Sequence, residues 1–407
     1  GNDTIDGGSG NDSITGNTGA DVLTGGAGSD VFIYALTAST QAAADRITDF
    51  ATGTDKIQIT AATVASGATV DYSSKGTAAN AVDAMGLLSS KVGEYYFNTT
   101  TNTLVLDTDG NGLLQSGDFA VTLSSLAAIG ALDVEITITD AGGAESITTG
   151  SGNDTVNMTD ATANKADSIN AGAGDDTINT IRGSLNDTTS DTIVGGAGND
   201  TLNIGGTAGT IAAFGTDAAL ATVENININT AGSTLDLSAQ TEAFNVTMVS
   251  TASTAGVTLN TGAHTVTGGT GADTVTVSTR AILLSAASIN GGAGTDSIVV
   301  GTASTAFVDS DFTKIASVES LTLTGASSIV LGANATAAGI ATVVTGNDDT
   351  SITSTQAALA VTGTSLATTK VLTLLGSANY TVTSGGTAHD RITATGSTGT
   401  LNATFGD

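Results

Sequence analysis

The sequence contains no cysteine among its 407 residues. This absence excludes disulfide bonds, catalytic thiols and zinc sites built from thiolates. An extracellular protein without disulfide bonds must be stabilised in another way, and bound metal ions are one such way.

Basic residues are also scarce. Lys and Arg number 10 against 39 Asp and Glu, which gives a formal net charge of −29. Ten basic residues do not supply the basic face that nucleic-acid binding requires, so we expect no nucleic-acid partner. The carboxylates repel one another unless cations neutralise them. High net charge is typical of disordered chains, but periodic Val and Ile and a positive mean hydropathy argue against disorder.

Aromatic residues make up 3% of the chain, and tryptophan is absent, although apolar residues reach 40%. The apolar side chains are mostly Ala, Val, Ile and Leu, which favour thin, layered β structure. No uninterrupted apolar run reaches the roughly 18 residues of a membrane span, so we expect none. No signal peptide is visible and the first residue is not Met, so we expect a piece of a larger protein.

Catalytic motifs are missing as well. His264 and His389 each stand alone, and the sequence contains no H-E-x-x-H, G-x-S-x-G or G-x-x-x-x-G-K-[ST] motif. We interpret His389 as a surface residue. The sequence therefore predicts no enzymatic activity and no catalytic residues.

A nine-residue repeat opens the chain, which begins GNDTIDGGSGNDSITGNTGADVLTGGAGSDVFIY. Its aspartates are Asp3, Asp12, Asp21 and Asp30, and the apolar residues two positions later are Ile5, Ile14, Leu23 and Phe32. The pattern predicts a six-residue turn with glycines at positive φ, then a short strand whose apolar side chain points inward. Two units would complete one coil, which places Asp3 and Asp21 on one edge and Asp12 and Asp30 on the other.

Carboxylates stacked one coil apart, about 4.8 Å at the spacing of β-strands, repel strongly without a cation. Ca²⁺ takes six to eight hard oxygen ligands, which two aspartates and the carbonyls of two glycine turns can supply. A flexible linker rich in Gly, Asn and Asp is the alternative, but it would not need apolar residues in register. The predicted ligands here are Asp3, Gly8, Gly10, Asp12, Gly19, Asp21, Gly26, Gly28 and Asp30.

The unit returns at 149–156, 166–179, 190–203, 268–275 and 286–299, and in degenerate form at 385–392. We expect Asp154, Asp176 and Asp200 on one edge and Asp167 and Asp191 on the other, whereas Ala287 leaves one ligand missing. The predicted ligands of these copies are Gly152, Asp154, Asp167, Gly172, Gly174, Asp176, Asp191, Gly196, Gly198, Asp200, Gly269, Gly271, Asp273, Gly292, Gly294, Asp296 and Asp390.

A different loop spans 107–118, where Asp107, Asp109, Asn111 and Asp118 have the spacing of an EF-hand loop. Its last ligand is Asp instead of Glu, which shortens the reach and should weaken bidentate coordination. The flanking residues predict strands, so the alternative is a hairpin turn with acidic side chains.

These motifs resemble those of known families. The nonapeptide is similar to the Ca²⁺-binding repeat of RTX proteins. Residues 1–130 resemble the C-terminal calcium-binding region of RTX exoproteins, including serralysin-type proteases, on the strength of DRITDF (45–50) and GTDKI (53–57). In that family this region is associated with type I secretion.

Residues 131–407 resemble bacterial S-layer proteins of the RTX kind, through the related strands ALDVEITIT, ATVENININ and ASVESLTLT. We interpret Glu135, Glu224 and Glu319 in these strands as facing solvent.

The fold class predicted is all-β, with parallel β-roll or β-helix segments interspersed with sandwich-like strand modules. The predicted boundaries are a β-roll at 1–35, a capping domain at 36–130, a roll module at 131–210, a second roll with strands at 211–300 and a degenerate module at 301–407.

The predicted function is a calcium-dependent structural protein of a bacterial surface layer, secreted and located at the cell surface. It would bind multiple Ca²⁺ ions and associate with itself into a lattice or fibre, with cell-surface polysaccharide as a further partner. The alternatives are a secreted adhesin or matrix protein, and the non-catalytic tail of a secreted hydrolase.

Overall fold

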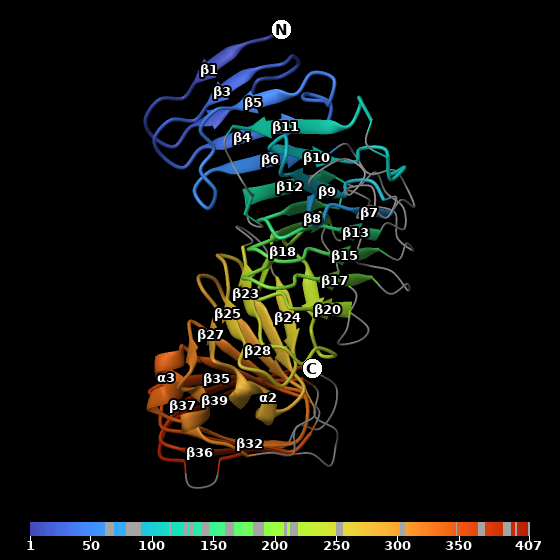
Figure 1. The fold of residues 1–407 in the computed structure, drawn as a ribbon. Helices are drawn as coiled ribbons and strands as arrows, with labels where there is room; N and C mark the ends of the chain where they lie inside the picture. The colour runs from blue at the N-terminus through green and yellow to red at the C-terminus, as the bar shows by residue number, and fades with distance from the viewer. Residues whose placement is uncertain are drawn as a thin grey trace. The chain divides into compact units, whose positions relative to one another are not determined.

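A computed structural model shows a chain built almost entirely of short β-strands (Figure 1). The structure describes residues 1–61, 69–78, 91–113, 115–124, 129–130, 133–139, 146–158, 167–181, 191–206, 210–211, 219–249, 255–301, 306–346, 348–364, 371–385, 392–394 and 397–405. The chain divides into two units, 1–203 with 218–224 and 204–217 with 225–407. No helix in these residues is long and apolar enough to cross a membrane.

The first unit begins with a parallel coil that has strands on two sides. One side carries β1 (Thr4–Asp6), β3 (Val22–Thr24) and β5 (Asp45–Ile47), and the other carries β2 (Ser13–Ile14), β4 (Val31–Ala35) and β6 (Lys56–Thr60). Ile5 lies beside Leu23, and Ile14 lies beside Phe32. Two nonapeptides therefore make one coil, which confirms the predicted alternation. The coil continues through β5 and β6, beyond the nonapeptides.

The group of strands that follows β6 includes antiparallel pairs. It contains β7 (Thr69–Asp71), β8 (Ser74–Ala78), β9 (Tyr95–Asn98), β10 (Thr103–Leu106) and β11 (Phe119–Leu123). Strand β10 pairs antiparallel with β9 and β11, and β11 pairs in parallel with β5. Tyr95, Tyr96 and Phe97 are all buried, and Tyr96 packs in a cluster with Val105 and Ala120.

The remainder of this unit returns to parallel rungs. They are β12 (Val134–Thr139), β13 (Ser146–Thr148), β14 (Thr155–Asn157), β15 (Ser168–Asn170), β16 (Thr177–Ile181), β17 (Thr192–Val194), β18 (Thr201–Gly205) and β20 (Leu220–Ala221). Strand β12 pairs with β6 and β14, while β13 pairs with β7 and β15. The central residue of each nonapeptide strand, such as Ile169 or Ile178, is buried between the sheets.

Every strand pair that the structure describes in the second unit is parallel. One sheet contains β19 (Thr210–Ile211), β22 (Thr234–Asp236), β24 (Gly256–Leu259), β26 (Thr274–Val277), β28 (Ser297–Val300), β31 (Ser320–Leu323), β33 (Thr342–Thr345), β35 (Ala358–Thr364), β37 (Asn379–Gly385) and β39 (Leu401–Phe405). The strands facing it are β21 (Asn225–Ile228), β23 (Asn245–Met248), β25 (Thr265–Thr267), β27 (Ser288–Asn290) and β30 (Ile315–Ala316), then β29 (Ala306–Phe307), β32 (Ser327–Leu331), β34 (Thr350–Ser354), β36 (Leu372–Gly376) and β38 (Ile392–Thr393).

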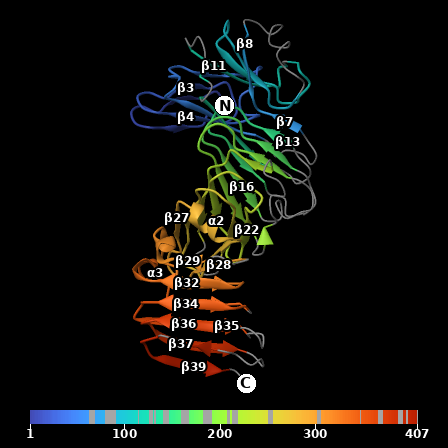
Figure 2. The same cartoon turned by 90° about the horizontal axis from the view of Figure 1, so that it is seen from below.

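Successive rungs of this unit are visible in Figure 2 as the stack of β32, β34 and β36. Short helices α2 (Arg280–Ser285), α3 (Ala333–Ala338) and the 3₁₀ helix η3 (Asp309–Phe312) interrupt the turns. The strands between the nonapeptides, for which the sequence predicted sandwich-like modules, are further parallel rungs. These rungs keep an inward-facing apolar residue where the glycine–aspartate turn is lost.

A buried ion-pair network ties β7 to β8 in the first unit. Lys75 Nζ lies 3.0 Å from Asp71 Oδ2 and 3.2 Å from Glu94 Oε1, and both carboxylates are buried. Lys91 reaches the same Asp71 oxygen at 3.4 Å, but its side chain is 45% exposed. Breaking the pairs of Lys75 leaves buried charge uncompensated, whereas Lys91 contributes little because water screens it.

We therefore expect Lys75→Met to lower the free energy of unfolding by about 3 kcal/mol, and Lys91→Met to lower it by less than about 1 kcal/mol. Urea unfolding at saturating calcium measures both. Equal effects of the two substitutions would contradict this assignment.

Candidate metal centres

Aspartates of the repeat form ladders along the edges of the coil. On one edge, Asp21 Oδ1 accepts the backbone N–H of Asp3 at 2.6 Å, and Asp45 Oδ1 accepts that of Asp21 at 2.8 Å. Each carboxylate thus binds the backbone of the preceding rung. Asp45 in turn donates its own N–H to the hydroxyl of Ser39 at 2.8 Å, which closes this ladder with a neutral acceptor.

The opposite edge repeats this arrangement. Asp30 Oδ1 accepts the N–H of Asp12 at 2.9 Å, and Asp55 Oδ1 accepts that of Asp30 at 3.0 Å. Asp45 and Asp55 were not among the predicted ligands, because no glycine turn precedes Asp45 and a single glycine, Gly53, precedes Asp55. The available signal was the apolar residue two positions later, Ile47 or Ile57, as in the repeats.

The second oxygen of these carboxylates is buried without a hydrogen-bond partner. This holds for Oδ2 of Asp12, Asp21, Asp30 and Asp45. A buried anionic oxygen without a partner is costly, so the carboxylate must either bind a proton or a cation. Burial, together with the neighbouring Asp21 carboxylate, raises the pKa of Asp45 to about 6. These atoms are where a cation would be stabilised most.

Backbone carbonyls point at the same places. A Cβ atom at Gly7 would lie 2.7 Å from Gly25 O and 2.8 Å from Asp12 Oδ2, so the carbonyl of the next turn and the carboxylate converge there. The same pair of atoms recurs at Gly268, where a Cβ would collide with Gly291 O and lie 2.9 Å from Asp273 Oδ2. Glycine is required here because a side chain would fill the space between these oxygens.

The turns stack closely one above the other. Gly8 and Gly26 have φ of +94° and +99°, and a Cβ at Gly26 would collide with Gly8 O. Ala27 N–H donates to Gly8 O at 2.9 Å, so this carbonyl already accepts one hydrogen bond from the next turn. A carbonyl oxygen has a second lone pair and can still bind a cation. The set of carboxylate and carbonyl oxygens fits Ca²⁺, which prefers many hard oxygen ligands.

The later repeats of the first unit have the same ladders. Asp176 Oδ1 accepts the N–H of Asp154, and Asp200 Oδ1 accepts that of Asp176, both at 2.8 Å. Asp191 Oδ1 accepts the N–H of Asp167 at 3.1 Å on the other edge. The predicted division between edges is therefore correct. Burial and the neighbouring carboxylates raise the pKa of both Asp154 and Asp176 to about 7.

Most glycines of these turns have a positive φ angle. Positive φ angles occur at Gly172, Gly174, Gly196 and Gly198, and in the other turns at Gly10, Gly19, Gly28, Gly292 and Gly294. Gly152 is required for another reason, because a Cβ there would collide with Val134 O. The carbonyls of Gly269 and Gly271 lie against Gly292 and Gly294 in the same way.

The ladder of the second unit ends on a glutamate. Asp273 Oδ1 accepts the N–H of Ala255 at 3.0 Å, and Asp296 Oδ1 accepts that of Asp273 at 2.7 Å. Glu319 Oε2 then accepts the N–H of Asp296 at 2.8 Å. Asp390, the last predicted ligand, and His389 lie outside the described residues.

The interpretation of the three Val-Glu strands needs correction. Glu224 Oε2 accepts the N–H of Asp200 at 2.8 Å, so Glu224 and Glu319 are ladder positions and not simply solvent-facing ones. Glu135 differs, since it lies opposite Gln58 in the strand pairing and Ile136 occupies the ladder position. The same Val-Glu sequence therefore occurs in two different registers relative to the ladder.

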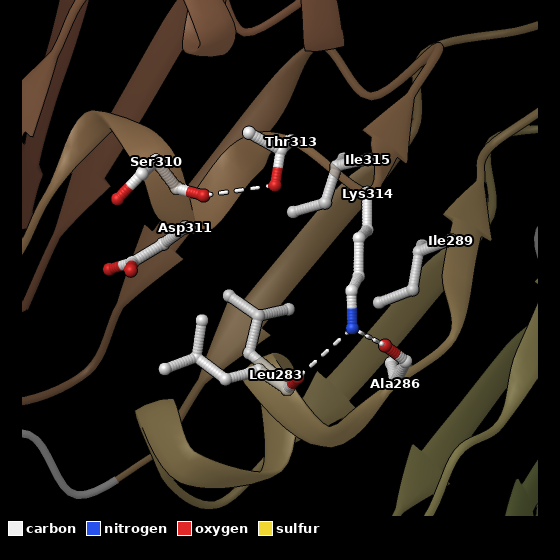
Figure 3. A pocket seen from close by; sticks show the side chains of 9 residues that line it. Leu283, Ala286, Ile289, Ser310, Asp311, Thr313, Lys314 and Ile315 are labelled. Carbon is white, nitrogen blue, oxygen red and sulfur yellow. Dashed lines mark hydrogen bonds between the residues drawn. The ribbon is translucent and has the colours of Figure 1, made fainter.

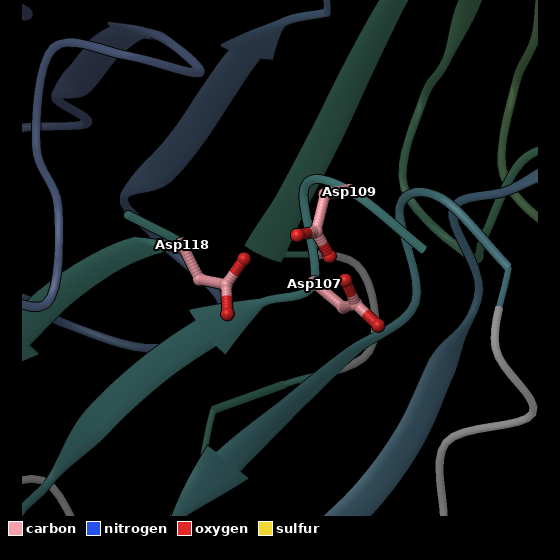
Figure 4. A group of neighbouring side chains, drawn as sticks. All are labelled: Asp107, Asp109 and Asp118. Carbon is pink, nitrogen blue, oxygen red and sulfur yellow. The ribbon is translucent and has the colours of Figure 1, made fainter. Parts of the chain in front are cut away.

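The loop at 107–118 gathers three carboxylates. Ligand atoms of Asp107, Asp109 and Asp118 lie within 4.8 Å of one another. Figure 4 shows the three side chains. However, backbone N–H groups already occupy the oxygens of Asp107 (from Gly110 and Gly112, both 2.8 Å). Burial raises the pKa of Asp107, and the charge of Asp118 adds to this effect. The loop connects β10 and β11 as a hairpin.

A histidine occupies one ladder position of the second unit. His264 is fully buried, and its Nδ1 accepts the N–H of Phe244 at 3.2 Å. Nε2 therefore carries the proton and donates to Asn260 Oδ1 at 2.5 Å, while the ring stacks on Phe244. Burial lowers the pKa of His264. This neutral ring replaces the carboxylate as acceptor and needs no cation.

We expect Asp176→Asn to keep the hydrogen bond to the N–H of Asp154 but to weaken calcium binding by about tenfold, because the charge is lost from a ligand. A calcium titration followed by circular dichroism measures the midpoint. Asp6→Asn is the matched control, since Asp6 is exposed and lies off the ladders. A midpoint unchanged in Asp176→Asn would contradict the assignment.

The pH dependence of stability should reveal His264. Because its folded pKa is lowered, its contribution is fully present above the unfolded value of about 6.5 and is lost as the pH falls through the folded pKa. His264→Asn, which does not titrate, should lose less stability than the wild type between pH 7.5 and 5.5 in urea unfolding at saturating calcium. Identical pH profiles would show that His264 is not buried in its neutral form.

Two family models match the chain. Residues 2–134 match Peptidase M10 serralysin C terminal, and residues 137–157, 163–183 and 186–210 match the RTX calcium-binding nonapeptide repeat. No curated protein and no solved structure matches the chain. Both matched regions are non-catalytic and typical of exported proteins. Residues 2–134 are therefore similar to the calcium-binding region that ends serralysins, and residues 137–210 carry calcium-binding repeats of the RTX type, for which multiple Ca²⁺ ions are expected.

Proposed function

We propose that the chain is a calcium-dependent structural protein of a bacterial surface layer. Calcium would fill the ladders outside the cell, complete the fold and allow copies of the chain to associate. The observation that carries this proposal is the series of buried Oδ2 atoms without partners at Asp12, Asp21, Asp30 and Asp45. Where calcium is scarce, as inside a cell, these groups oppose folding and keep the chain exportable.

The outward-facing side chains of the strands are largely polar, which favours polar contacts between copies of the chain. Asn179 Nδ2 donates to Asn157 Oδ1 at 2.8 Å, and Asn203 Nδ2 donates to Asn179 Oδ1 at 2.9 Å, which forms a regular polar file along successive strands. Large exposed apolar side chains are few and scattered among the described residues, such as Leu113 and Val249. A chain of net charge −29 therefore needs cations, and not an apolar patch, to approach another copy.

The described residues contain hollows of different sizes. The pocket in Figure 3 lies beside α2 and is lined by apolar residues such as Leu283 and Ile289, with Lys314 Nζ donating to Ala286 O at 3.0 Å; its volume is about 40 Å³. Two more open hollows, one beside Tyr96 and one beside Asp349, have volumes of about 280 and 440 Å³. We propose that the chain itself is not an enzyme, because both matched regions are non-catalytic.

One alternative has a specific observation in its favour. The match of residues 2–134 to the serralysin C terminal region supports a non-catalytic calcium-binding tail of a secreted hydrolase. An adhesin that uses exposed aromatic residues is less favoured, because Tyr95, Tyr96 and Phe97 are buried. The surface-layer role and the tail role differ in whether copies of the chain assemble.

The purified chain in excess chelator should show disordered circular dichroism, and millimolar calcium should convert it to β structure. Electron microscopy of the calcium form should then show regular two-dimensional arrays. A chain that is fully folded in chelator would refute the calcium requirement. Calcium-induced folding that leaves only monomers in microscopy and light scattering would favour the hydrolase tail.

A further inference from the structure

One ladder in each unit ends in the same unusual turn. In a regular rung, six residues separate one strand from the next, as in Gly291–Asp296 between β27 and β28. After β30 only Ser317, Val318 and Glu319 precede β31. After β20 only Thr222, Val223 and Glu224 precede β21. The turn is three residues shorter, and its last residue is Glu instead of Asp.

The short turn reproduces the oxygen pair of a regular turn. At Gly268 a Cβ would meet Gly291 O and Asp273 Oδ2. One rung later, a Cβ at Gly291 would meet Ser317 O and lie 2.7 Å from Asp296 Oδ2. Ser317, with φ +51°, therefore presents its carbonyl where the first glycine of a regular turn does.

The same substitution occurs in the first unit. A Cβ at Gly195 would meet Thr222 O and lie close to Asp200 Oδ2, and Thr222 also has φ +51°. Glu224 and Glu319 hold the N–H of the preceding aspartate at the same distance, 2.8 Å. A side chain longer by one methylene thus compensates for the shorter turn.

The last ladder of the second unit also contains an unsatisfied ligand atom. Asp296 is 2% exposed, and its Oδ2 has no hydrogen-bond partner and is directed at Gly291. The negative charge of Glu319 lies on the next rung, which would make an ion-free site repulsive. A carboxylate pair, a converging carbonyl and a buried unpartnered oxygen are the features of the regular calcium rungs.

We propose that Ser317–Glu319 and Thr222–Glu224 complete one further divalent-cation site each, in which Glu319 and Glu224 are ligand carboxylates in the place of aspartate. The inference rests on the proposed calcium function and extends it to residues outside the glycine–aspartate repeat. Each short turn ends its ladder with a glutamate. The backbone N–H of the last aspartate thus has an acceptor, and the last site has its second carboxylate.

The test counts bound calcium in the full chain. Glu319→Gln retains an oxygen that can accept the N–H of Asp296 but removes the charge. We expect isothermal titration calorimetry and metal analysis to show one ion fewer per chain, or that site weakened by about tenfold or more. Glu319→Asp should behave similarly, because the shorter side chain does not span the three-residue turn.

Glu135→Gln is the control, since Glu135 shares the Val-Glu motif but lies off the ladder, and its calcium count should not change. A folded Glu319→Gln chain that binds as much calcium as the wild type, with equal affinity, would overturn the inference. So would an equal loss in Glu135→Gln. If Glu319→Gln does not fold at any calcium concentration, Glu224→Gln decides by the same criteria. A wild-type chain that binds no calcium would instead refute the proposed function itself.

Discussion

Repulsion between like charges one rung apart is the constraint on which this structure depends. Each ladder aspartate uses one carboxylate oxygen to bind the backbone of the preceding rung, which fixes the register of the coil. The other oxygen faces the glycine turn and, at Asp12, Asp30 and Asp296, has no partner. The two oxygens of one side chain therefore have different roles. The turn needs glycine because an added Cβ would clash with the oxygens that converge there. The site needs a cation because the buried charge would otherwise be uncompensated.

The backbone role and the charge role of a ladder position can be separated. His264 and the hydroxyl of Ser39 accept a rung amide without bringing charge, whereas Asp and Glu bring both an acceptor and a charge. The coil therefore continues through rungs that need no metal, provided that an inward apolar residue and an amide acceptor are present. This explains why the second unit remains a parallel coil while its glycine–aspartate turns become sparse.

The sequence predicted those parts of the site in which the period is regular. The assignment of Asp154 and Asp176 to one edge required only the repeat and its interruptions, because the strand register leaves no other choice. Asp45 escaped detection because its rung lacks a glycine turn, and Glu319 because its turn is three residues shorter, so that no fixed spacing connects it to Asp296. The backbone amide whose hydrogen each one accepts identifies both as ladder positions. The parallel rungs between the repeats of the second unit were predicted as sandwich-like strands, since alternating polar and apolar residues describe any half-exposed strand.

The short strands also determine which residues are free to vary. In a strand such as Thr177–Ile181, Ile178 is directed into the core, while Thr177 and Asn179 face outward. The turns tolerate little change because backbone oxygens occupy the space that side chains would need. The outward positions are limited neither by core packing nor by the crowded turns. Parallel pairing repeats them at the spacing of adjacent strands. The outward-facing residues of the coil can therefore be substituted one at a time without disturbing the apolar core or the turns.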